Sequence, residues 1–375
     1  MITVIADDIT GAAEIAGIGL RFGKRVSMVT TIDSLPNCDL LVYVTDTRSM
    51  SEQDAVRESR DVIYRLWNLG CYNLFKKTDS ALRGHVIPEL RVIMKETGFD
   101  KVLLIPQNPS KNRIIKDGIY YIDGEPLHKT SFASDPEFPT RTADVMERLN
   151  NKVTVVNPSD IIGESGIFVF EAVNKYDIEK ALCHIDRYTL LAGGADFFTA
   201  WLILNDGIKD INIPEFEGIG DRNIIVVCGS TVAHSLADSH YFRQRKIPFF
   251  SMPSDVFDGG DTKDWLEEMT AEYKQHKSAI LSIGHPPHEG KEFAVRLRNI
   301  ITEATTTLIE TAMPQELVIE GGATAFGILE KLKWNNFNIT DEIAPGIVRM
   351  SLMAGTDIHI TLKPGSYAWG ENLFK

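Results

Sequence analysis

The sequence predicts an α/β protein of two domains, each with a mainly parallel sheet flanked by helices, and an active site in the cleft between them. Short apolar segments alternate with helix-like segments along the first half of the chain, a pattern typical of parallel sheets. A polar, glycine-containing stretch at 208–223 interrupts the alternation, and a second series follows it. The 375 residues suffice for two separate cores. We therefore expect a first domain at 1–210 and a second at 211–375.

Capping residues bound the helices expected in the first half. A helix is expected over 11–22, directly after the first apolar segment. Ser51 and Asp54 have the spacing of a capping box that opens a second helix, and Gly98 closes a third helix over 85–97. The apolar segments between these helices predict strands at 2–6, 26–30, 39–44, 72–77 and 101–106.

A long irregular segment at 106–140 breaks this rhythm. Such segments are uncommon in compact domains without a functional reason, and residues 117–127 have the pattern of a small hairpin. A helix is expected near 176–187. The remaining apolar segments predict strands at 153–157, 167–173, 223–230, 247–253, 278–284, 317–325, 346–353 and 357–365.

The composition excludes several classes of partner. With 39 Lys and Arg against 52 Asp and Glu, the formal net charge is −13, which argues against nonspecific binding to nucleic acid or an anionic membrane. The sequence has no signal-peptide pattern and no apolar run of about 18 residues. Its four scattered cysteines suggest neither a disulfide framework nor a zinc site, and they fit a reducing cytoplasm.

Polar side chains follow three strands of the first half. The carboxyl ends of parallel strands meet at one edge of a sheet, so these side chains are expected to converge there. Aspartates at such turns also cap helices, but arginine and lysine do not cap helix N-termini, which favours a binding site. Carboxylates can accept a proton, and guanidinium groups can hold an anion. The residues are Asp7, Asp8, Asp46, Arg48, Lys77, Asp79, Arg83 and His85.

The second half has glycines where the first half has charges. Glycine turns let backbone N–H groups approach a phosphate, although each one alone is more often a simple tight turn. Neither a P-loop nor a dinucleotide fingerprint is present. His285 and His288 have no evident third partner, so no zinc site is expected. The strand ends of this half are expected to carry almost no charge; the turn residues are Gly229, Ser230, Gly321, Gly322, Ala323, Thr324 and Gly365.

The combination "ADDITGAAE", "TDTRS", "KKTDSALRGH", "GS", "GGAT" and "LKPGSYAWG" resembles the four-carbon acid sugar kinase family. The resemblance runs from residue 2 to about residue 370. It implies an N-terminal domain that binds a sugar acid such as threonate, erythronate or 3-oxo-tetronate. It also implies a C-terminal nucleotide-binding domain and transfer of the γ-phosphate of ATP to the terminal hydroxyl of the acid.

The chain departs from the family pattern at three places. The family usually has GGDT where Ala323 stands, while the literal GGDT at 259–262 does not follow a buried strand and is set aside. Glu14 stands where Asp is usual, and the Pro-rich "GR" segment is altered to "PQNPSKNRII". These departures leave open which four-carbon acid is used.

The resemblance suggests roles for the converging residues. Asp8 would accept the proton of the attacking hydroxyl or orient that hydroxyl, with Asp79 and Arg83 as the other catalytic residues. Sugar-acid contacts would come from Asp7, Asp46, Arg48 and Lys77. ATP would bind at the second-half turn residues, with Mg²⁺ bridging its β- and γ-phosphates and no protein side chain assigned to the metal.

Two other hypotheses stay open from the sequence. One is a sugar-acid-binding protein without turnover, which the Ala323 departure favours. The other is a phosphatase with an Asp nucleophile in "ADDIT", although the motif lacks the usual DxDx[TV] spacing. A homodimer is compatible with the sequence, which does not determine the oligomeric state.

Overall fold

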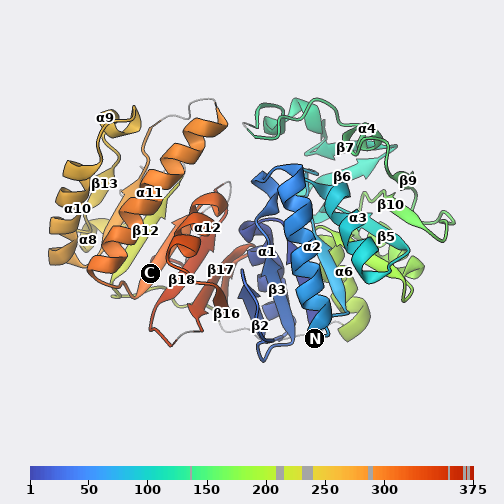
Figure 1. Ribbon diagram of the computed structural model, residues 1–375, viewed down its shortest axis with the longest axis horizontal. Coiled ribbons are helices and arrows are strands. Elements are labelled where there is room, and N and C mark those ends of the chain that lie inside the picture. The colour runs from blue at the N-terminus through green and yellow to red at the C-terminus, as the bar shows by residue number, and fades with distance from the viewer. Residues whose placement is uncertain are drawn as a thin grey trace. The chain divides into compact units, whose positions relative to one another are not determined.

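The computed structural model describes residues 1–135, 137–207, 215–229, 240–285, 290–353, 355–365, 369 and 372–375. These group into two compact units, which we describe separately (Figure 1). Unit 1 contains Met1–Val26 and Thr30–Asn212, and unit 2 contains Ser27–Val29 and Ile213–Lys375. Ser230 and His288, which the sequence singled out, lie outside the described residues.

The described strands of unit 1 form a parallel sheet in the order β3-β1-β4-β11-β5-β10-β9. Its central strands are almost entirely buried, as expected for a sheet covered on both faces. The strands are β1 (Ile2–Ala6), β3 (Leu40–Val44), β4 (Leu74–Lys77), β5 (Lys101–Ile105), β9 (Thr154–Val156), β10 (Gly166–Phe170) and β11 (Thr189–Gly193).

The helices of unit 1 begin and end largely where capping residues predict. The Ser51 hydroxyl accepts a hydrogen bond from the Asp54 amide at 3.2 Å, and Gly98 ends its helix at φ 77°. Both predicted caps are thereby confirmed. The helices are α1 (Ile9–Arg21), α2 (Glu52–Asn68), α3 (Val86–Thr97), α4 (Val145–Arg148), α5 (Lys175–Ala181) and α6 (Ala195–Asp206); short 3₁₀ turns occur at Thr47–Ser49, Pro109–Lys111, Leu127–Lys129, Ser131–Ser134 and Leu182–His184.

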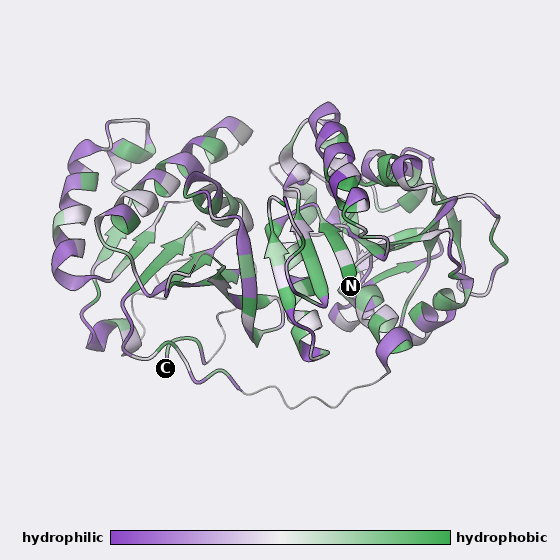
Figure 2. Ribbon diagram, turned by 60° about the horizontal axis from the view of Figure 1, so that its bottom comes forward, coloured by the Kyte–Doolittle hydropathy of each residue, from purple (hydrophilic) through white to green (hydrophobic). Residues whose placement is uncertain are grey.

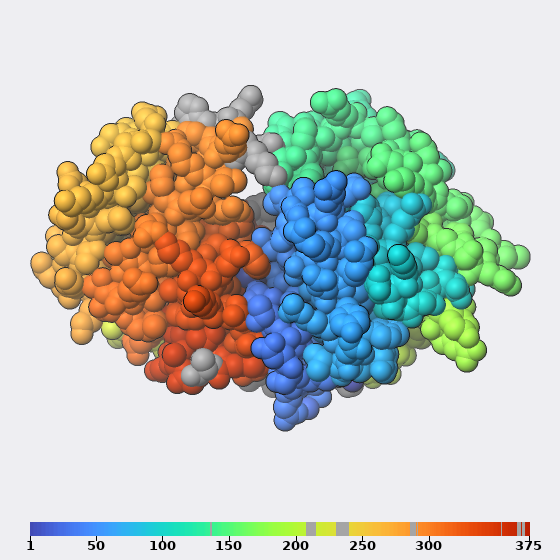
Figure 3. Space-filling model, viewed as in Figure 1, coloured from blue at the N-terminus to red at the C-terminus, as the bar shows by residue number. Residues whose placement is uncertain are grey.

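The irregular segment after β5 contains a small antiparallel sheet of β6 (Arg113–Lys116), β7 (Ile119–Ile122) and β8 (Glu125–Pro126). The expected hairpin is its β7–β8 part. Tyr120 and Leu127 anchor the segment, since both are fully buried. Its outer part forms the green surface at the top of unit 1 in Figure 3.

The described strands of unit 2 follow the order β13-β14-β12-β15-β18-β17-β16-β2. The first five of these strands run parallel to one another. Each of the last three runs antiparallel to the strand before it in this order. They are β2 (Val26–Val29), β12 (Ile224–Cys228), β13 (Phe249–Ser251), β14 (Ala279–Ser282), β15 (Glu316–Glu320), β16 (Asn336–Ala344), β17 (Ile347–Leu352) and β18 (His359–Lys363).

Two features of this sheet were not anticipated. β16 was absent from the expected strands, although Phe337 and Ile339 alternate with exposed residues as on a half-buried strand. Residues Ser27–Val29 pair antiparallel with β16 and group with unit 2, which their position in the chain does not indicate.

The helices of unit 2 bury mainly apolar residues, such as Trp265 and Leu329, and Figure 2 shows hydrophilic and hydrophobic residues alternating along their ribbons. None of the described helices of the chain is long and apolar enough to cross a membrane. The helices of unit 2 are α8 (His240–Gln244), α9 (Ser254–Phe257), α10 (Lys263–His276), α11 (Lys291–Thr311) and α12 (Gly322–Lys331).

Candidate functional site

The strand register of unit 1 brings the predicted polar turns to one edge. Ala6 at the end of β1 lies level with Val44 of β3 and with Lys77 of β4. The residues that follow these strands therefore leave the sheet at the same height, as expected for the carboxyl edge of a parallel sheet.

Arg48 lies at the centre of this edge, in the 3₁₀ turn after β3. Its guanidinium donates to both oxygens of Asp7, at 3.0 and 3.1 Å, and to Asp8 Oδ1 at 2.7 Å. Its Nη1 also lies 3.6 Å from Asp79 Oδ1. One arginine thus holds three of the four aspartates that the sequence predicted to converge. Asp46 introduces the turn in the left-handed region at φ 50°.

Asp8 is the N-cap of α1. Its Oδ1 accepts a hydrogen bond from the Gly11 amide at 3.0 Å, and its Oδ2 accepts one from the Thr10 hydroxyl. Burial by itself raises the pKa of Asp8, but Arg48 and Lys77 outweigh that effect and hold it below its usual range. Asp8 is therefore ionised at neutral pH, which makes it a fixed hydrogen-bond acceptor.

Asp79 and Arg83 form a second pair in the turn after β4. Arg83 Nε and Nη2 donate to the two oxygens of Asp79 at 3.0 and 2.8 Å, and Arg83 Nη1 donates to Asp135 at 2.9 Å. Asp79 also accepts the amides of Ala81 and Arg83. Although burial raises the pKa of Asp79, the charges of Arg48 and Arg83 lower it overall, so this carboxylate also stays ionised.

Lys77 meets an acidic partner that the sequence analysis noted only as a departure. Glu14 on α1 lies 3.5 Å from Lys77 Nζ and accepts a hydrogen bond from Lys111 at 2.6 Å. Burial raises the pKa of Glu14, and the two lysines more than offset this and lower it. His85, by contrast, is not part of this ionic network, since its Nε2 contacts the Met50 carbonyl at 2.8 Å.

The irregular segment supplies residues that the sequence analysis missed. Arg113 donates to the Ser80 hydroxyl, and its Cζ lies 5.8 Å from the Phe132 ring centroid. Arg83 lies over the same ring at 5.1 Å. The preceding residue, Asn112, takes the left-handed conformation (φ 53°). The only sequence signal for Arg113 was the altered "GR" segment.

The glycine turns of unit 2 also lie at one edge, because Cys228, Glu320 and Lys363 are level across β12, β15 and β18. Gly229 donates to the Glu320 carbonyl at 3.1 Å, and Gly321 donates to the Lys363 carbonyl at 2.9 Å. These two amides are therefore engaged, and the N–H groups left for a phosphate are those of the first turn of α12, which have no partner within the helix.

Two glycines in these turns have structural constraints. Gly321 is the N-cap of α12 at φ 102°, a conformation that residues with a Cβ rarely adopt. A Cβ on Gly229 would meet the Thr324 hydroxyl and would lie 2.9 Å from the Glu320 carbonyl oxygen. Gly322 begins the helix, and Ala323 is exposed in its first turn. Apart from Gly365 itself and its chain neighbours, no atom of the described residues lies within 4 Å of where a Cβ on Gly365 would be.

The strand ends of unit 2 are not free of charge, so that expectation was wrong. Lys363 Nζ donates to Glu320 Oε1 at 2.7 Å and to the Pro364 carbonyl at 3.1 Å, and both side chains are buried. Burial, with a smaller contribution from Glu320, raises the pKa of Cys228 to about 12. The two charges of this ion pair neutralise each other, and the pair lies at the ends of β15 and β18, directly before the turns.

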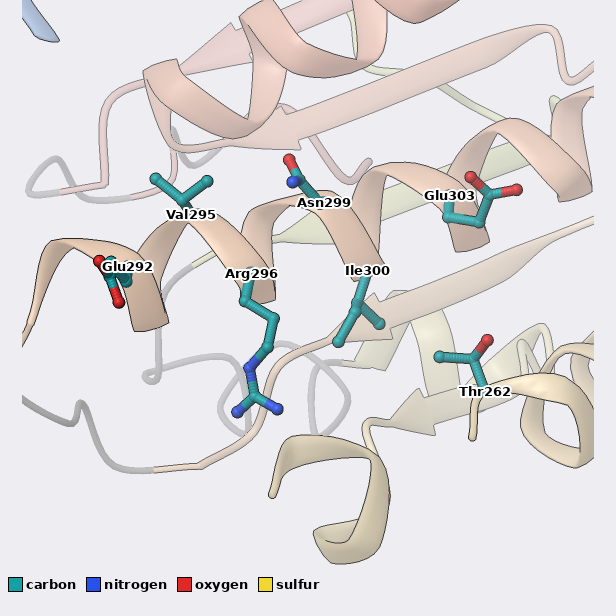
Figure 4. A pocket seen from close by; sticks show the side chains of 7 residues that line it. All are labelled: Thr262, Glu292, Val295, Arg296, Asn299, Ile300 and Glu303. Atoms are coloured by element: carbon teal, nitrogen blue, oxygen red, sulfur yellow. The ribbon is translucent and has the colours of Figure 1, made fainter. Parts of the chain in front are cut away.

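A cavity of about 410 Å³ runs along α11, lined by Thr262, Glu292, Val295, Arg296, Asn299, Ile300 and Glu303 (Figure 4). Arg296 donates to the Phe257 carbonyl. None of the predicted nucleotide-binding residues lines this cavity; Thr262 belongs to the literal GGDT that we set aside. Among the described residues, no cluster of three or more His, Cys, Asp or Glu side chains is suited to a metal ion.

Two family models match the chain. A sugar-binding N-terminal domain matches residues 2–197, more than half of the chain, and a nucleotide-binding C-terminal domain matches residues 225–367. The chain belongs to the four-carbon acid sugar kinase family. The two-domain α/β fold class and the family resemblance are thereby confirmed.

Several named relatives of the family are similar over nearly their full length. The 3-oxo-tetronate kinase of Brucella melitensis is 22% identical over 97% of this chain and 92% of its own. The D-threonate kinase of Salmonella typhimurium is 25% identical over 92% of this chain and 89% of its own. A solved structure of a Haemophilus influenzae protein matches with a TM-score of 0.75 at 20% identity, covering 100% of this chain and 98% of that one, which shows a shared fold.

Proposed function

We propose that this protein is an ATP-dependent kinase that phosphorylates the terminal hydroxyl of a four-carbon sugar acid of the threonate, erythronate or 3-oxo-tetronate type. The enzyme class is that of the family, a small-molecule kinase. The observation that supports the proposal most strongly is the match of one chain to both a sugar-binding and a nucleotide-binding domain.

In the proposed reaction, unit 1 holds the sugar acid at the Arg48-centred edge. The attacking hydroxyl donates a hydrogen bond to Asp8, a bond forms between its oxygen and the γ-phosphorus, and the bond from that phosphorus to the β-phosphate oxygen of ATP breaks. ADP leaves, and the hydroxyl proton passes to Asp8. Since phosphoryl transfer depends chiefly on positioning, the lowered pKa of Asp8 suits an orienting acceptor better than a strong base. Asp7, Asp46, Arg48, Lys77, Asp79 and Arg83 would shape this site.

ATP would bind in unit 2 at the glycine turns, where the free amides in the first turn of α12 would face the phosphates. Gly229, Gly321, Gly322, Ala323, Thr324 and Gly365 are the described residues of this proposed site. Mg²⁺ would arrive bound to ATP, because magnesium in such sites relies largely on phosphate and water ligands. The nearby Glu320 already pairs with Lys363, and Ala323 has no ligand atom, so no side chain here is assigned to the metal.

The comparisons disfavour an Asp-nucleophile phosphatase, because curated relatives that match nearly the full length of this chain are named as kinases. The motif "ADDIT" also lacks the DxDx[TV] spacing typical of such phosphatases. The sugar-acid-binding protein without turnover remains the alternative to test.

A coupled assay of ADP release tests the proposal. The full chain is incubated with MgATP and each stereoisomer of threonate, erythronate and 3-oxo-tetronate, and calorimetry measures binding of ATP and of each acid. We expect turnover with at least one acid. Binding of an acid without ATP binding or turnover would support the non-catalytic alternative, and hydrolysis of the phosphorylated acids would support a phosphatase.

Gly11→Ala should lower kcat strongly while changing the free energy of unfolding only slightly. The new Cβ would lie 2.6 Å from Asp8 Oδ1 and 3.3 Å from Lys77 Nζ, so the Asp8 carboxylate must move. Alanine favours the helix by up to about 1 kcal/mol, which offsets part of this cost. A displacement of about 1 Å in a catalytic group can lower kcat on the order of 10²-fold. Steady-state kinetics and urea unfolding check this, and an unchanged kcat would show that the placement of Asp8 is unimportant.

Gly321→Ala should weaken ATP binding and spare the sugar acid. Alanine at φ 102° stores roughly 1–3 kcal/mol of strain, which α12 relieves by shifting its first turn. The backbone N–H groups of this turn would then no longer point at the phosphates. Calorimetry with a nonhydrolysable ATP analogue should show at least a tenfold loss of affinity, with Gly70→Ala, at an open surface turn of unit 1 (φ 85°), as the control for strain alone. Equal loss in both variants would contradict the assignment.

A further inference from the structure

We propose that Arg113 binds the carboxylate of the substrate and thereby selects a sugar acid over a neutral four-carbon polyol. This inference rests on the proposed function and names the part of unit 1 that recognises the acid group. It follows from the way the cations of the site are already paired.

The other basic residues at the edge of the sheet already have carboxylate partners. Arg48 pairs with Asp7 and Asp8, and Arg83 uses its two edges on Asp79 and Asp135. Lys77 and Lys111 both pair with Glu14. A cation paired in this way has little attraction left for a second carboxylate, so these residues hold the acidic groups of the site in place.

Arg113 differs from them in the part of the chain that the structure describes. Its Nη1 donates to the Ser80 hydroxyl, it has no acidic partner there, and its Nε and Nη2 have no hydrogen-bond partner there. None of its nitrogens is a buried unpaired atom, so these donors are open to solvent or to a ligand. The Nε–Nη2 edge of a guanidinium can hold a carboxylate through two parallel hydrogen bonds.

The position of Arg113 also fits. Ser80, which it contacts, directly follows Asp79, and Arg113 shares the Phe132 ring with Arg83. A sugar acid whose carboxylate rests on Arg113 therefore lies beside the Asp79–Arg83 pair. Arg148, which contacts the same turn after β4, also has no ion-pair partner among the described residues. Its Nη2 donates to the Ala81 carbonyl at 2.8 Å and its Nε is buried without a partner, which leaves it less accessible to a carboxylate.

The test compares a substrate acid with its uncharged amide. For the wild-type enzyme we expect a kcat/KM roughly 10–100-fold higher for the acid, and Arg113→Gln should remove that preference by raising the KM for the acid. The KM for ATP should not change, and Arg113→Lys should recover part of the preference. Arg91→Gln is the matched control, because Arg91 is an exposed arginine on α3.

Each outcome decides the inference. An acid preference that persists in Arg113→Gln overturns it, and loss of the preference only in Arg148→Gln moves the carboxylate to Arg148. If the wild-type chain turns over none of the acids, the kinase proposal fails, and calorimetry with the acids alone then decides. Binding of an acid that Arg113→Gln abolishes supports the inference without the kinase, whereas no acid binding to the wild type overturns both.

Discussion

Asp8→Asn should lower kcat by roughly 10²–10⁴-fold with little change in the fold. Asparagine is as good an N-cap as aspartate, so the hydrogen bond from the Gly11 amide is retained and α1 still begins correctly. The variant cannot accept the proton of the hydroxyl, and it loses the negative charge that Arg48 holds in place. Single-turnover kinetics should therefore show a slow chemical step, while calorimetry should show near-normal affinity for ATP.

The pH dependence gives an independent check on Asp8. Since its pKa is lowered, the carboxylate stays ionised, and kcat/KM of the wild type should be flat between about pH 5 and 8 on account of this group. The same shift contributes stability that is present above the ordinary pKa of 3.8 and is lost as the pH falls further. Asp61→Asn, an exposed change on α2, is the matched control. A near-normal kcat in Asp8→Asn would remove Asp8 from the mechanism.

Local signals in the sequence predict those parts of the site that depend on neighbouring residues. The turn after β1, the cap at Ser51 and the glycine at position 98 follow from short-range chemistry, and the parallel sheet brings the polar turns together. The glycine at position 321 was predicted as a turn residue, but only the structure shows that the left-handed constraint falls on it and not on Gly322.

The missed features depend on contacts between distant segments. Arg113 reaches Ser80 across the irregular segment, and β16 is a strand because it pairs with β17 and β2. The Glu320–Lys363 pair joins two strands that are neighbours only in the folded sheet. No spacing rule along the chain encodes which cation will find an acidic partner. Among the described residues, Arg113 has no such partner, which distinguishes it from Arg48, Lys77 and Arg83.

The two lysines of β4 illustrate this point and lead to a prediction about stability. Side chains alternate along a strand, so Lys77 faces the site edge near α1 while Lys76 points to the other face of the sheet. There Lys76 Nζ lies 2.6 Å from Glu89 Oε2 of α3, with both side chains about 2% exposed. Neither group makes an aligned hydrogen bond, so the pair loses hydration without full compensation.

Lys76→Met alone should lower the free energy of unfolding by about 3–5 kcal/mol, because it leaves the carboxylate of Glu89 buried without a partner. Glu89→Leu alone should do the same to the ammonium group of Lys76. The double variant Lys76→Met/Glu89→Leu should recover at least most of this loss, since two apolar side chains of similar volume can pack in the same place. Urea unfolding of the four proteins gives the coupling energy directly.

Kinetics of the same four proteins distinguish a role of Lys76 in the stability of unit 1 from a role in its site. If Lys76 serves only the fold, the double variant should keep the wild-type kcat and the KM for the sugar acid, because Lys77 points to the opposite face of β4 and the Arg48-centred edge lies beyond the carboxyl end of the strand. A double variant as unstable as the single ones would mean that the pair contributes more than its desolvation costs. A stable double variant with a large loss of kcat would instead make Lys76 a positioning residue that acts on the site through β4.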